Sequence, residues 1–221
     1  MKIYFKNWLI KLYKSSWFIT LFATTLGVLL AFYLNDLSSR SKIEDRKQVS
    51  IQNITNELLN NKTELTDSEN NERLIEFLTK VRDINDEIPN ELITTIGFMN
   101  TLSKNYSDFM VIQDSIKIDE TNYKYDIAYR FNLILDDLQN IAWEAFKMSD
   151  ITNELDYSCL QVLVKIYSLQ EIYINEQQKI LDYFVNAEHT KLLSALQITK
   201  QLEYQLLNTT REGLEEITNC N

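Results

Sequence analysis

The sequence predicts a mainly α-helical protein in which an N-terminal transmembrane helix continues into a helical bundle. Residues 16–34 form an uncharged, largely apolar run of nineteen residues, which at helical rise covers roughly 28 Å, the thickness of a bilayer core. Beyond that run, apolar residues recur at helical spacing along most of the chain. The 221 residues include only three Gly and one Pro, which favours long helices with few connections over turn-rich β architectures.

The run at 16–34 is typical of a membrane anchor. Trp17 and Tyr33 stand at its two ends, where aromatic belts lie. A secretory signal peptide would have a shorter apolar region and a small-x-small cleavage site, which is absent after Leu34. We therefore expect an uncleaved signal anchor, preceded by a basic juxtamembrane segment at 1–15. The protein is expected to be a single-pass protein of the cell inner membrane, in contact with the lipid bilayer.

The charge distribution bears on orientation and partners. Four Lys precede the span and four Lys or Arg follow it, so the positive-inside rule gives a tie. Acidic residues dilute only the second flank, which favours a periplasmic domain over a cytoplasmic one. Residues 1–47 carry a net charge of +5 and residues 48–221 carry −15. Because an acidic domain repels nucleic acid, we expect no nucleic-acid partner.

Three small residues, Ala23, Gly27 and Ala31, are spaced four apart and share one face of the anchor helix. Such a stripe lets two helix backbones approach closely and is a pairing pattern in membranes. It predicts a homo-oligomer. Chance is the alternative, because Ala and Gly are common in membrane helices.

A heptad-like stripe follows the anchor, from Ile43 to Leu65. Lys47 and Asn61 interrupt it, which favours one face of a bundle over a two-stranded coiled coil. We expect a helical stalk at 35–66 and one acidic helical domain at 67–221, because no repeat or low-complexity linker divides the rest.

Within this domain the elements are predicted from periodicity and breakers. A helix that carries Leu74 to Ile84 is expected to end before Pro89, and Asn90 to cap another helix that continues to about Leu102. The weak alternation near 105–125 predicts a short strand pair or irregular chain. The remaining expectations are helical spacing from Tyr125 to Ala142, a turn at 150–156, and an antiparallel pair of long helices at 157–186 and 188–217.

The chain offers little material for a reaction centre. His189 is the only histidine, and its surroundings match no catalytic motif, so a surface or capping role is expected. Two Cys and one His do not make a recognisable zinc site. The isolated glycines form no phosphate-binding loop. We expect no enzyme, no catalytic residues, no metal and no cofactor.

Aromatic residues gather around one predicted turn: Trp143, Phe146, Tyr157 and Tyr167. They are either a corner that binds a partner or ligand, or a core corner where two helices meet. Nearby, Cys159 pairs with Cys220 in one disulfide, or both remain thiols; the spacing does not decide.

Two stretches resemble a known family. The first is residues 26–36, Leu-Gly-Val-Leu-Leu-Ala-Phe-Tyr-Leu-Asn-Asp, running into a charged helix with Asp-Arg-Lys at 45–47. The second is residues 142–149, Ala-Trp through Ser, followed by a Leu-x-x-x-Tyr-type helix at 160–167. Together they are similar to an uncharacterised family of small single-span membrane proteins of Bacteroidota. Asp36 and Asp150 depart from its usual Asn and Gly, and its Trp after the asparagines is absent. The resemblance implies a bacterial envelope location and no activity.

These observations favour a non-enzymatic, membrane-anchored interaction, scaffold or sensor protein that acts through helix association, as a homo-oligomer or with a protein partner. The alternative is a membrane effector, in antiviral defence or a toxin-like system, that perturbs the bilayer when it oligomerises. An enzyme with a non-standard site is the third hypothesis.

Overall fold

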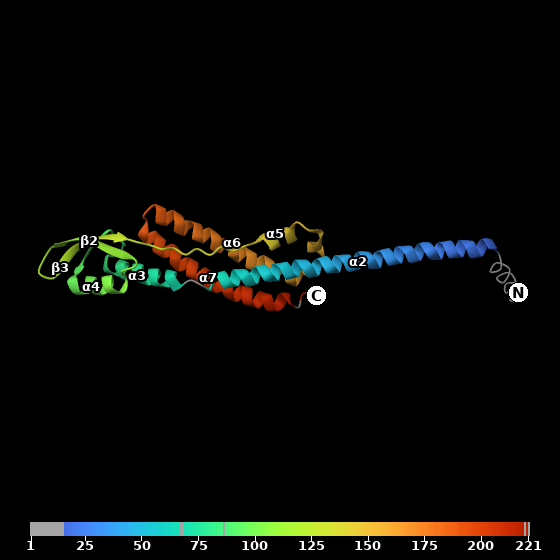
Figure 1. The fold of residues 1–221 in the computed structure, drawn as a ribbon, viewed down its shortest axis with the longest axis horizontal. Coiled ribbons are helices and arrows are strands. Elements are labelled where there is room, and N and C mark those ends of the chain that lie inside the picture. Colours follow the sequence, from blue (N-terminus) through green and yellow to red (C-terminus); the bar gives the residue numbers. More distant parts are fainter. Residues whose placement is uncertain (1–15, 67–68, 86, 219, 221) are drawn as a thin grey trace. The chain divides into compact units, whose positions relative to one another are not determined.

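The computed structural model describes residues 16–66, 69–85, 87–218 and 220, so the basic segment 1–15 lies outside the described residues. The fold is mainly α-helical with a small sheet, which confirms the predicted fold class (Figure 1). The elements are α2 (Ser16–Glu64), α3 (Glu69–Asn85), β1 (Glu91–Thr95), α4 (Ile96–Asn105), β2 (Met110–Lys117), β3 (Asn122–Tyr129), α5 (Ile141–Lys147), the 3₁₀ helix η1 (Asp150–Glu154), α6 (Tyr157–Val185) and α7 (His189–Ile217).

The chain divides into two compact units, Met1–Ile51 and Gln52–Asn221, and the boundary falls inside α2. The predicted anchor is the N-terminal part of that helix. It is long and apolar enough to cross a membrane, and none of its apolar window is buried. An apolar helix near an N-terminus is either a membrane anchor or a signal sequence, and its length and composition here are compatible with both.

The threonine hydroxyls in this part of α2 are satisfied within the helix. Thr20 donates to the carbonyl of Ser16 at 2.9 Å, and Thr25 donates to that of Leu21 at 2.8 Å. Thr24 also donates to Leu21, at 2.9 Å. Hydroxyl groups bonded back to the helix need no water, which suits an apolar environment.

In the second unit α6 and α7 lie side by side and run antiparallel (Figure 1), which confirms the predicted helix pair. The connection turns at Ala187, whose φ is 55°. Gly213 lets the helices approach closely, because a Cβ at that position would come within 2.5 Å of Ile166 Cδ1. Near the start of α6 and the end of α7, side chains of α6 therefore pack directly against the backbone of α7.

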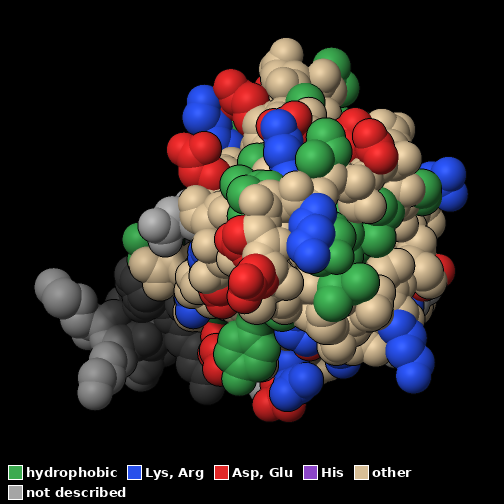
Figure 2. Space-filling model, turned by 90° about the vertical axis from the view of Figure 1, so that its left-hand side faces the viewer, with side chains coloured by type: hydrophobic (Ala, Val, Ile, Leu, Met, Phe, Trp, Pro, Cys, Tyr) green, Lys and Arg blue, Asp and Glu red, His purple; other side chains and the backbone are tan. Residues whose placement is uncertain are grey.

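The sheet has the order β1-β3-β2, with both pairs antiparallel. The predicted strand pair is therefore confirmed as the β2–β3 hairpin. Leu92, Tyr125 and Ile127 point into a core that also contains Phe77 of α3 and Leu192 of α7. Figure 2 views the domain from this end and shows hydrophobic side chains at the surface among acidic and basic ones. The exposed hydrophobic residues of the sheet and its hairpin turn are Ile93, Ile116 and Ile118.

Two local predictions are wrong. Asn90 does not cap a helix, because β1 follows it and pairs with β3; Thr95 caps α4 instead, accepting from the Phe98 amide at 3.3 Å. The helical spacing from Tyr125 to Ala142 also fails. Tyr125 belongs to β3, and residues 130–140 are extended chain that leads to the short helix α5.

Asparagine side chains explain why residues 130–140 stay extended. Asn61 donates to the Gln139 carbonyl at 2.7 Å and accepts from the Gln139 amide at 2.9 Å. Asn71 likewise donates to the Ile134 carbonyl at 2.8 Å and accepts from the Ile134 amide at 3.4 Å. Each amide side chain thus satisfies both backbone groups of one residue, which removes the need for a helix or a partner strand there.

Candidate functional site

A groove of about 580 Å³ lies between α5 and α6. This volume falls in the range typical of small-ligand sites. The groove combines aromatic, aliphatic, amide and charged side chains: Asn140, Trp143, Glu144, Lys147, Val164, Tyr167, Ser168, Gln170, Glu171, Ile174 and Asn175.

The predicted aromatic corner forms one wall of this groove. Trp143 and Tyr167 stack with ring centroids 5.0 Å apart and planes within 3° of parallel. The Phe146 and Trp143 rings also stack, with their centroids 5.9 Å apart. All three are buried. They form a core corner, as one of the two interpretations predicts, and Trp143 and Tyr167 also line the groove. Tyr157 is not part of it, because its side chain is 74% exposed.

Glu57 of α2 is hydrogen-bonded to residues of this corner. Its carboxylate accepts from the Tyr167 hydroxyl at 2.6 Å and from the Ala142 and Trp143 amides at 2.7 and 3.4 Å. Those amides belong to the first turn of α5, whose own N-cap residue, Asn140, makes no side-chain capping bond. An acidic group from a distant helix therefore supplies the cap of α5.

A second buried link joins α2 to α6. Asn61 donates to Gln170 Oε1 at 3.2 Å, and Gln170 donates to the Gln139 carbonyl at 2.9 Å. Asn61 and Gln170 are both almost fully buried. The groove is thus built on α5, α6 and the 130–140 segment, which buried hydrogen bonds connect to one another and to α2.

Burial shapes the acid–base properties near the groove. Desolvation raises the pKa of Tyr167, and the hydrogen bond to the Glu57 carboxylate raises it further. Six residues further along α6, Tyr173 donates to Asp136, and desolvation raises the pKa of both groups. These phenols stay protonated and act as hydrogen-bond donors rather than as bases.

Charges line the mouth of the groove. Lys147 Nζ lies 5.6 Å from the centroid of a Trp143 ring and 2.7 Å from Glu144 Oε1. Both side chains are about two-fifths exposed. Glu171, on the opposite wall, makes no ion pair with any residue that the structure describes.

The other predicted positions lie apart from this groove. Ala23, Gly27 and Ala31 are exposed on α2, and a Cβ on Gly27 would meet nothing within 4 Å. His189 begins α7, and its ring meets those of Tyr129 and Phe131 edge-on, with ring centroids 5.0 and 5.5 Å apart. Within the described part of the chain, no group of three or more His, Cys, Asp or Glu could hold a metal ion.

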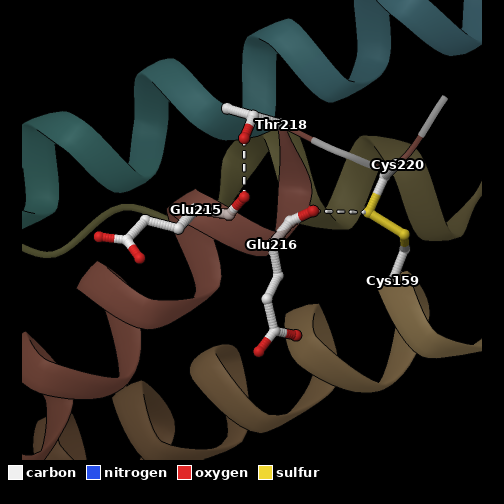
Figure 3. The surroundings of a disulfide bond; sticks show 5 residues. All are labelled: Cys159, Glu215, Glu216, Thr218 and Cys220. Carbon is white, nitrogen blue, oxygen red and sulfur yellow. Dashed lines mark hydrogen bonds between the residues drawn. A yellow bond between two sulfur atoms is a disulfide. The ribbon is translucent and has the colours of Figure 1, made fainter.

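Cys159 and Cys220 form a disulfide, with their Cα atoms 6.0 Å apart (Figure 3). The bond joins the first turn of α6 to the residues that follow α7. Of the two possibilities that the sequence leaves open, the structure has the bonded one. The Glu216 carbonyl oxygen lies 3.5 Å from the Cys220 sulfur.

Sequence reasoning missed the residues beneath the groove. Glu57, Asn61 and Gln170 are polar and buried, and their partners lie 31 to 110 residues away. The one available signal was Asn61 as a polar interruption of an apolar stripe. No protein-family model, curated protein or solved structure matches this chain.

Proposed function

We propose that this chain is a non-enzymatic, membrane-anchored interaction protein whose acidic domain senses a ligand or partner at the groove between α5 and α6. One observation carries the proposal. The single helix α2 contains both the exposed apolar run and, near its other end, Glu57 and Asn61, which hold the groove together. A change at the groove would therefore act directly on the helix that enters the membrane.

The anchor rests on the exposed apolar surface of α2. Its large side chains are uncovered, among them Phe22 at 57%, Leu29 at 60% and Phe32 at 70%. A continuous uncovered stretch of this kind needs an apolar partner, and a bilayer suits its length. We infer that α2 remains attached and spans the inner membrane once.

Membrane extraction tests the anchor. The expressed full chain should stay in the membrane pellet after alkaline carbonate and keep its intact N-terminal mass. Two variants form a matched pair, Leu26→Arg in the apolar run and Leu37→Arg beyond it. Only the Leu26→Arg protein should be released from the pellet. A shortened, soluble product would show instead that the run is a cleaved signal sequence.

The disulfide supports a periplasmic domain, because such bonds persist in oxidising compartments and are rare in the cytoplasm. The accessibility of the cysteines reports the side of the membrane on which the domain lies. In intact cells treated with a membrane-impermeant reductant and a bulky maleimide, Cys220 should be modified without lysis. Labelling only after lysis would place the domain in the cytoplasm.

Self-association is proposed through Ala23, Gly27 and Ala31. A Cβ at position 27 would meet nothing within 4 Å, so Gly27→Leu should leave the monomer intact and block close helix approach. Cross-linking in membranes should give dimers for the natural chain and for Thr25→Leu, which faces away, but not for Gly27→Leu. Equal cross-linking of all three would contradict the pairing face. If dimers form and expression collapses the membrane potential, the effector hypothesis gains over the sensor.

A further inference from the structure

The groove between α5 and α6 has walls whose chemistry selects a ligand. Trp143 presents an aromatic ring, and Glu144 and Glu171 present carboxylates, against the single ammonium group of Lys147. The lining residues therefore carry one net negative charge. They belong to a segment, residues 48–221, that carries −15. Such a site attracts cations and repels anions before any contact is made.

Lys147 already shows how a cation sits there. Its ammonium group lies 5.6 Å from the Trp143 ring centroid and 2.7 Å from a Glu144 oxygen. An aromatic face and a carboxylate around one positive charge are the two elements of organic-cation recognition. The Lys147 side chain is two-fifths exposed, so it can leave this position at little loss.

Other ligand classes fit less well. An anion would find the only cation of the lining neutralised by Glu144. A wholly apolar ligand would cover Asn140, Ser168 and Asn175 and leave their polar groups without water or partner. A short apolar chain that ends in an ammonium or guanidinium group satisfies each wall, with Val164 and Ile174 available to its methylenes.

We propose that this groove binds an organic cation, an alkylammonium or guanidinium group on a short aliphatic chain, between Trp143, Glu144 and Glu171, where it replaces the Lys147 ammonium. The cation comes from a free amine or from a basic side chain of a partner. Because Glu57 caps α5 from α2, occupancy is communicated to α2 through the amides of Ala142 and Trp143. This deepens the proposed sensing function, but binding itself does not depend on the anchor.

The test is calorimetric titration of the full chain in an uncharged detergent at about physiological salt. The probes are 1,5-diaminopentane, the end-blocked peptide Gly-Lys-Gly, and glutarate as an anion of similar length. We expect the diamine to bind and glutarate not to bind. Binding of the peptide alone would assign the cation to a partner protein rather than to a free amine, and absence of both would overturn the proposal.

Two variant pairs sharpen the result. Glu171→Gln should weaken diamine binding at least about tenfold. Glu212→Gln, the same charge change at an exposed position of α7, should leave diamine binding unaltered. Lys147→Met should tighten binding severalfold by removing the internal competitor, whereas Lys165→Met, on the exposed side of α6, should not. Equal effects within either pair would mean that the diamine responds to the general acidity of the surface rather than to the groove, and would overturn the assignment. Because these measurements need no membrane, they can fail while the anchor and topology tests succeed.

Discussion

The hydroxyl of Tyr167 on α6 donates to the carboxylate of Glu57 on α2 at 2.6 Å, and the same carboxylate accepts two amides from the first turn of α5. Three elements therefore meet at one buried acid. Glu57 is 8% exposed, so no solvent replaces a donor that is lost. Its hydrogen bonds decide whether α5, and with it the groove wall, is held in place.

Glu57→Gln should lower the free energy of unfolding by about 2 kcal/mol, because the amide group turns an N–H toward donors. Tyr167→Phe should lower it by about 1 kcal/mol, since the α5 amides keep their acceptor. Denaturant unfolding in detergent, followed by circular dichroism, measures both. Glu212→Gln is the control, and a loss in Glu57→Gln no larger than in this control would contradict the structural role.

Gly213→Ala and Gly97→Ala should move stability in opposite directions. At Gly213 the new methyl would come within 2.5 Å of Ile166 Cδ1 and 2.9 Å of Val162 Cγ1, so we expect a loss of about 1–3 kcal/mol. At Gly97, in α4, nothing lies within 4 Å, so reduced backbone freedom should add about 0.5 kcal/mol. Thermal unfolding of both variants checks the signs; a Gly213→Ala variant as stable as the natural chain would contradict the close contact of α6 and α7.

The disulfide should contribute about 2–4 kcal/mol by restricting the unfolded chain. The double variant Cys159→Ser, Cys220→Ser should unfold at correspondingly lower denaturant concentration. A reductant should shift the natural chain to the same midpoint and leave the double variant where it is. If the reductant leaves the natural chain unchanged too, the bond is absent in the folded protein.

His189 should make stability depend on pH. Desolvation lowers its pKa in the folded state, and its buried Nδ1 has no hydrogen-bond partner among the described residues. The unfolded chain takes up the proton near the ordinary pKa of about 6.5. The stability that neutral His189 provides is therefore present above about pH 6.5 and lost as the pH falls through the lowered folded-state pKa.

His189→Phe isolates this contribution from that of the carboxylates. The free energy of unfolding of the natural chain, relative to that of the variant, should fall between about pH 7 and pH 5. Denaturant unfolding at a series of pH values provides the comparison. Parallel curves for the two proteins would show that His189 is equally solvated in both states.

Local periodicity predicted the elements whose apolar pattern repeats every two to four residues. The helix pair α6–α7 and the exposed run of α2 follow from apolar spacing and from the near absence of breakers. The strand pair β2–β3 also left a weak signal, the alternation near 105–125. In each of these cases the information is carried by residues two to four positions apart.

The same reasoning failed where distant side chains decide the backbone. Ile134 and Leu138 are spaced like a helix, yet Asn71 and Asn61 satisfy the backbone of Ile134 and Gln139 and keep that segment extended. The aromatic corner was predictable as a cluster. That Tyr157 lies outside it, and that Glu57 lies beneath it, depends on tertiary packing, which no single window of the sequence contains.

The bond between Cys159 and Cys220 encloses nearly all of the helical hairpin of α6 and α7 in one covalent ring. A protease that cuts the exposed turn at 186–188 would open this ring without releasing a fragment, because the two helices remain joined at their other end. The nicked chain would migrate as a single species until reduced, and the groove wall on α6 would keep its place beside α7.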